Sequence, residues 1–120
     1  MQSGLLDLNT ITNLLELNDP TEPNTFFAEL VKEFFIQAAQ LISIIKQLID
    51  QHNSLELVSH LHSLKGASLN MGALALAAAC ETIEIALENN RLSEMNSWPA
   101  KLELIYQETV QAMEQIKNTI

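Results

Sequence analysis

Residues 25–51 read TFFAELVKEFFIQAAQLISIIKQLIDQ and contain neither glycine nor proline. Apolar residues recur along this stretch at intervals of three and four, which is the spacing of one buried face of an α-helix. A helix of this length makes about seven turns and is roughly 40 Å long at 1.5 Å per residue. Its predicted buried stripe consists of Phe27, Leu30, Val31, Phe34, Ala38, Leu41, Ile42, Ile45, Leu48 and Ile49.

Four further helices are predicted, over residues 8–18, 54–70, 73–89 and about 94–118. Helix-favouring Leu, Ala, Glu and Gln are abundant, and no segment alternates apolar and polar residues as a strand would. Four long amphipathic helices joined by short turns pack antiparallel to their neighbours. The expected fold is all-α: one domain, residues 1–120, built as an up-down-up-down four-helix bundle with residues 8–18 as a short cover helix.

The charge balance excludes several classes of partner. Six Lys and Arg residues against fifteen Asp and Glu residues give a formal net charge of -9. A surface that binds nucleic acid must neutralise phosphate with basic residues, and an anionic membrane attracts basic segments in the same way. We therefore expect neither nucleic acid nor a membrane among the partners.

The single cysteine and the lengths of the apolar runs indicate a compartment. Cys80 has no second cysteine to pair with, so an internal disulfide cannot form. The first residues lack the basic start of a secretory signal, and no apolar run approaches the roughly 20 residues of a membrane span. These features predict a soluble, cytoplasmic protein.

The segment VSHLHSLKGASLNMG, which begins at Val58, does not fit an ordinary solvated helix face. At about 100° per residue, His62 points about 140° away from the apolar stripe of its helix, and therefore toward water. The same face carries two apolar residues, Val58 and Leu69, and Gly66, which costs a helix interior about 1 kcal/mol relative to alanine. A partner protein that approaches the imidazole closely would explain these residues, with Lys65 supplying a positive charge one turn away.

The motif His62-x-Leu64-Lys65-Gly66-Ala67-Ser68-x-x-Met71-Gly72 resembles that of histidine-containing phosphotransfer (HPt) domains of two-component phosphorelays, H-x-L-K-G-[SA]-[SA]-x-x-[LIM]-G. The resemblance implies that His62 is the phosphoacceptor, that Lys65 stabilises the phosphoryl group and that Gly66 gives steric clearance. It also implies that the partners are receiver domains and a hybrid histidine kinase. The receiver would contribute the aspartate and the Mg²⁺, and we expect the chain to be a monomer.

The chemistry of the side chains agrees with a phosphocarrier rather than an enzyme. A neutral imidazole nitrogen is a competent nucleophile, and the phosphoramidate it forms can pass its phosphoryl group on. The sequence contains no glycine-rich phosphate loop of the kind that binds ATP. The histidines and Cys80 also lack zinc-ligand spacing, so we expect no metal and no cofactor in the chain itself.

A partner for the second ring nitrogen follows from the predicted turn. If Gly72 ends the helix in a left-handed conformation, residues 82–84 of the next helix lie opposite His62. Glu84 could then accept a hydrogen bond from the ring and orient it, with Glu81 as the rival candidate.

The docking surface is expected to include Val58, Lys65, Gly66 and Leu69. On the first predicted helix, Ile11 and Leu15 share one face. That face is either buried as a lid or, as the family resemblance favours, an extension of the docking surface beside His62.

Other residues near the motif are expected to have structural rather than functional roles. The Ser68 hydroxyl, on the core stripe, is expected to bond a carbonyl one turn back, and Cys80 to be a small buried apolar residue. Ala67 stands where the family often has serine, and His60 where it is usually apolar. The alternative function is a helical-bundle adaptor or antagonist that binds receivers or kinases through the same surface without carrying phosphate.

Overall fold

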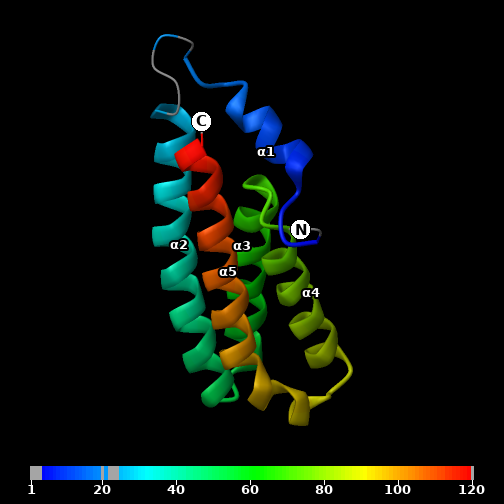
Figure 1. The fold of residues 1–120 in the computed structure, drawn as a ribbon. Helices are drawn as coiled ribbons and strands as arrows, with labels where there is room; N and C mark the ends of the chain where they lie inside the picture. The colour runs from blue at the N-terminus through cyan, green and yellow to red at the C-terminus, as the bar shows by residue number, and fades with distance from the viewer. Residues whose placement is uncertain (1–3, 20, 22–24, 120) are drawn as a thin grey trace.

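The structure is a computed structural model, and it describes residues 4–19, 21 and 25–119 (Figure 1). Within that part of the chain the regular structure is entirely helical, with no strand. None of the described helices combines the length and apolar character needed to span a membrane. The elements are α1 (Leu8–Leu15), α2 (Thr25–Asp50), α3 (Ser54–Asn70), α4 (Leu74–Glu88), the 3-10 helix η1 (Leu92–Ser97) and α5 (Trp98–Thr119).

The long helices lie side by side (Figure 1). Their buried apolar residues form one core. Helix α2 packs against α3 and α5, and α4 packs against the same two helices. The stripe expected on α2 is largely inside, where each apolar side chain contributes about 1.5–3 kcal/mol by leaving water. Its fully or nearly fully buried members are Phe27, Val31, Phe34, Ala38, Ile42, Ile45, Leu48 and Ile49.

Helix α1 is fixed on the turn between α3 and α4. The Asp7 carboxylate caps α1 by accepting hydrogen bonds from the backbone N–H groups of Asn9 and Thr10, and the Asp7 N–H donates to the Gly72 carbonyl at 2.7 Å. A Cβ on Gly72 would lie 3.0 Å from the Asp7 carbonyl oxygen and 3.0 Å from Ile11 Cγ1. The close approach of α1 therefore depends on a residue without a side chain.

Gly72 has φ +74° and ends the turn after α3 in the left-handed region, as its sequence position predicts. Helix α3 begins at Ser54, as expected. Its N-cap is Asn53, whose side chain accepts a hydrogen bond from the Glu56 N–H.

Four predicted helices have other bounds in the structure. The helix expected over 25–51 ends at Asp50. Helix α1 ends at Leu15 instead of residue 18. Beyond it, the N–H groups of Leu17 and Asn18 form turn hydrogen bonds with carbonyls three residues back instead of the four of an α-helix. The expected helix over 73–89 is Leu74–Glu88, flanked by cap residues. The expected helix over 94–118 is two elements, because η1 precedes α5 and Pro99 lies in the first turn of α5, where its missing N–H has no helical partner to lose.

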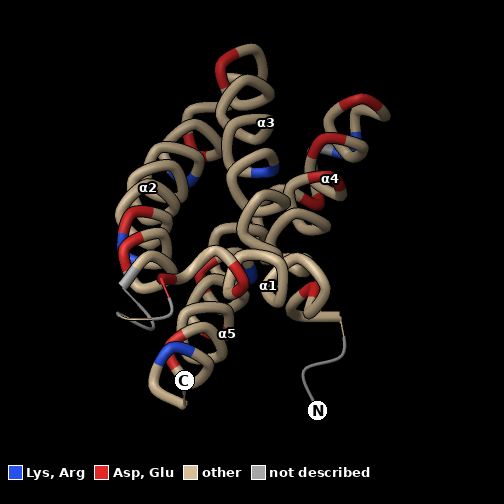
Figure 2. The backbone as a smooth tube through the Cα atoms, turned by 90° about the horizontal axis from the view of Figure 1, so that it is seen from above, with Lys and Arg blue, Asp and Glu red and all other residues tan. Residues whose placement is uncertain are grey.

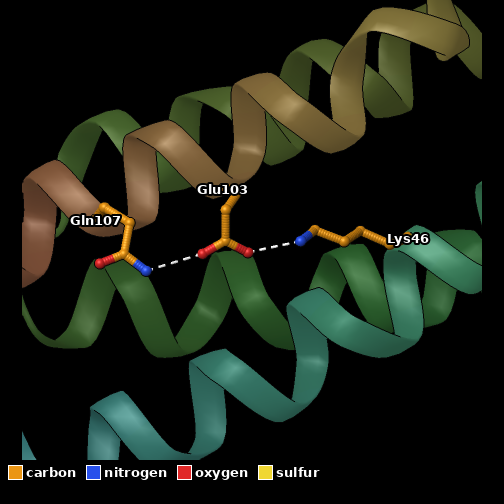
Figure 3. A network of polar contacts seen from close by, with 3 residues as sticks. All are labelled: Lys46, Glu103 and Gln107. Carbon is orange, nitrogen blue, oxygen red and sulfur yellow. Dashed lines mark hydrogen bonds and ion pairs between the residues drawn. The ribbon is translucent and has the colours of Figure 1, made fainter.

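A polar clamp that the sequence did not reveal joins α2 to α5 (Figure 3). Lys46 Nζ lies 2.6 Å from one oxygen of Glu103, and Gln107 Nε2 donates to the other at 2.9 Å. The hydrogen bonds from Lys46 and Gln107 hold the pKa of Glu103 below its ordinary value. The clamp is partly exposed, so its energy is limited by solvent screening.

Candidate functional site

His62 stands on the solvent side of α3. The opposite stripe of this helix is fully buried and consists of Leu57, Leu61, Leu64 and Ser68. Because the ring points away from that stripe, the His62 side chain is 63% exposed. An imidazole in this position can be reached by a second protein without any change in the core.

Lys65 is the one basic residue of α3, and it lies one turn from His62. Its Nζ is 3.9 Å from Glu81 Oε1 on α4, a loose contact across the surface. An exposed pair of this kind is worth at most about 1 kcal/mol, so the ammonium group can move to an incoming anion at low cost. Figure 2 shows that such basic positions are few among the acidic ones.

Gly66 has no structural reason to be a glycine. It is exposed in the middle of α3, has ordinary helical backbone, and a Cβ built on it would meet no neighbouring atom of the described residues within 4 Å. This contrasts with Gly72, where packing and backbone both require glycine. The space above Gly66 is therefore left open toward solvent, beside the ring.

Glu84 is the carboxylate that the structure brings to the imidazole. Its Oε2 lies 3.3 Å from His62 Nε2, across the α3–α4 contact, while Glu81 lies against Lys65. The Glu84 side chain is only 12% exposed, and its Oε1 is buried with no hydrogen-bond partner among the described residues. The proximity expected from the turn geometry is present; a role in orienting the ring stays a prediction.

The apolar residues expected at the docking surface separate into two groups. Leu69 is 48% exposed, and Val58 and Leu15 are half-buried, so all three offer apolar surface. Of the two alternatives for its face, the docking assignment of Ile11 is wrong and burial is correct: Ile11 is 2% exposed, because the Gly72 turn packs directly against it. Ile11 belongs to the core beneath α1, and a partner cannot contact it without displacing that helix.

The expectations for the buried and half-buried residues near the site are confirmed only in part. Ser68 is buried as expected, but its Oγ has no hydrogen-bond partner within residues 4–19, 21 and 25–119, so the predicted bond to a carbonyl one turn back is absent. His60 is half-buried, with its Nδ1 2.8 Å from the Glu56 carbonyl oxygen. Cys80 is fully buried; burial, with a smaller contribution from Glu84, raises the pKa of its thiol to about 12, against a lowering effect of Lys65.

The comparisons with known proteins agree with the geometry. The Hpt domain model matches residues 29–119, which include His62 and Glu84. Three solved structures of histidine-containing phosphotransfer proteins have similar folds. Protein B from Pseudomonas aeruginosa has 20% identity and a TM-score of 0.82 over 97% of this chain and 96% of its own. A protein from maize has 25% identity and a TM-score of 0.77 over 95% and 92%. One from Medicago truncatula has 25% identity and a TM-score of 0.79 over 98% and 84%. No curated protein is significantly similar in sequence.

Proposed function

The chain belongs to the Hpt domain family, and from that premise we propose that it accepts a phosphoryl group on His62 from a receiver-domain aspartate and passes it to another receiver. Hpt proteins are phosphocarriers rather than enzymes with catalytic sites, and they work with receiver domains and histidine kinases in phosphorelays. The observation that carries the assignment to His62 is an exposed ring beside a glycine with open space above it.

In the proposed step, a ring nitrogen of His62 attacks the phosphorus of the receiver's aspartyl phosphate. A nitrogen–phosphorus bond forms, the bond from phosphorus to the aspartate oxygen breaks, and its electron pair returns to the carboxylate. Such transfer depends on positioning and charge compensation. Lys65 supplies one positive charge on this side, and the Mg²⁺ belongs to the receiver in this proposal.

Docking would use Val58, Lys65, Gly66, Leu69 and Leu15. The area of such an interface is small, which suits a transient complex. Four of these residues lie on α3, within a stretch of twelve positions, so this part of the surface is held on one helix. We take the scaffold to be an antiparallel up-down-up-down four-helix bundle with α1 as its cover. The side-by-side packing of α2–α5 and the short α2–α3 and α3–α4 turns support this arrangement.

The test is transfer of labelled phosphate from a phosphorylated receiver. We expect label on the chain that is labile in acid and stable in alkali, and its loss in His62→Ala. Binding of the receiver without any label would instead support the adaptor or antagonist function. Label that survives in His62→Ala would show that another residue is the acceptor.

A further inference from the structure

Packing does not explain the carboxylate of Glu84. Its side chain is nearly buried between α3 and α4, yet no group in the described part of the chain forms a hydrogen bond with Oε1. Burying a carboxylate is unfavourable unless it is paired and hydrogen-bonded. Glutamine has the same shape without the charge, so the fold alone gives no reason for glutamate at this position.

The charges around Glu84 do not neutralise it well. Within the described part of the chain its one ion-pair contact is His62, which is charged only when protonated. Lys65, the nearest basic residue on α3, makes its contact with Glu81 instead. The imidazole therefore lies against a poorly compensated negative charge.

We propose that Glu84 acts on the phosphorylated state of His62: its charge shortens the lifetime of the phosphohistidine and favours transfer of the phosphoryl group away. This rests on the proposed function. A phosphoryl group carries close to two negative charges near pH 7. On the ring nitrogen that does not face Glu84, it would lie across the imidazole from the carboxylate, which contacts Nε2 at 3.3 Å. Solvent screens the repulsion between these two groups less than it would between two exposed charges, because Glu84 is only 12% exposed even though the ring is 63% exposed.

The same carboxylate assists the breaking of the bond. It lies 3.3 Å from His62 Nε2, where it can accept a hydrogen bond from an N–H on that nitrogen, and a ring that carries this N–H leaves as neutral imidazole. When the acceptor oxygen bonds to phosphorus, the nitrogen–phosphorus bond breaks and its electron pair stays on the ring as neutral imidazole. With water as acceptor, the products are inorganic phosphate and unmodified His62, and the water proton goes to solvent.

Glu84→Gln tests the proposal because it removes the charge and keeps the shape. The full chain is phosphorylated with phosphoramidate, a small-molecule donor that needs no receiver, and loss of phosphohistidine is followed by ³¹P NMR. We expect the half-life of the phosphohistidine to increase at least tenfold. Glu84→Asp, which keeps the charge, should restore a half-life closer to that of the wild type.

Glu88→Gln is the matched control, since Glu88 lies one turn further along α4 and is exposed. It changes the net charge equally and should leave the half-life within twofold. Equal half-lives for Glu84→Gln and the wild type would overturn the inference while leaving the phosphocarrier function intact. Equal lengthening by both glutamine variants would also overturn it, because the effect would then be one of net charge. Failure of the wild type to form phosphohistidine at His62 with both phosphoramidate and a phosphorylated receiver would overturn the inference and the proposed function together.

Discussion

Gly66→Ala should separate folding from function at the site, because the structure predicts opposite effects on the two. Alanine in an exposed helix interior is more stable than glycine by about 0.5–1 kcal/mol. The added Cβ meets nothing within 4 Å among the described residues, so no clash offsets this gain. The free energy of unfolding should rise by that amount, which for a domain of this size raises Tm by about 2–5 °C.

The same methyl group should impair transfer. It projects into the open space beside His62, where the receiver must approach, and a displacement of about 1 Å between reacting groups can lower a rate roughly 100-fold. We expect the rate of phosphoryl transfer from a phosphorylated receiver to fall roughly 10–100-fold. Stability is measured by urea unfolding, and transfer by rapid-quench assays of labelled phosphate.

Gly72→Ala is the control, because Gly72 has a positive φ and close neighbours, whereas Gly66 has neither in the described part of the chain. Its φ of +74° and the 3.0 Å distances to Asp7 and Ile11 predict a loss of stability of more than about 1 kcal/mol. The reasoning is refuted if Gly66→Ala is destabilised, since the space above the helix would then not be open. It is equally refuted if Gly66→Ala transfers phosphate within twofold of the wild-type rate.

Three further predictions concern the core and the clamp. Ser68→Ala should leave stability unchanged or raise it by up to about 1 kcal/mol in urea unfolding, because it removes a buried hydroxyl without a partner; a loss above 1 kcal/mol would mean that the hydroxyl is bonded. The raised pKa of Cys80 keeps the thiol protonated in the folded state, while in the unfolded state it ionises near pH 9. The contribution of Cys80 to the free energy of unfolding is therefore complete below pH 9 and declines between pH 9 and about 12. Urea unfolding across that range should show this decline, and Cys80→Ala should lessen it. The lowered pKa of Glu103 gives the opposite pH dependence. The contribution of Glu103 to the free energy of unfolding is complete above about pH 4.5 and is lost as the pH falls through the lowered pKa of the folded state. Glu103→Gln should make acid unfolding between pH 5 and 3 less steep, and an unchanged profile would contradict a role for the clamp.

Local pattern was enough to predict the helices and the exposure of His62. The stripe on α2 and the rotation of 100° per residue along α3 depend only on helix geometry, which the sequence specifies through apolar spacing. The resemblance of the motif from His62 to Gly72 to HPt domains indicated the family, and the match over residues 29–119 shows it. The Gly72 turn was also readable, because few residues other than glycine adopt a positive φ.

What the sequence determined by itself is thus the set of helices, their buried faces and the residue that stands exposed on α3. Tertiary structure decided what those faces meet. Ile11 was assigned to the docking surface, yet it is buried because α1 folds onto Gly72. The Lys46–Glu103 clamp joins residues 57 positions apart, and no local spacing predicts such a pair. The uncompensated charge of Glu84 likewise depends on which groups α3 and α4 bring together, since burial and pairing are properties of the packed helices rather than of any one of them.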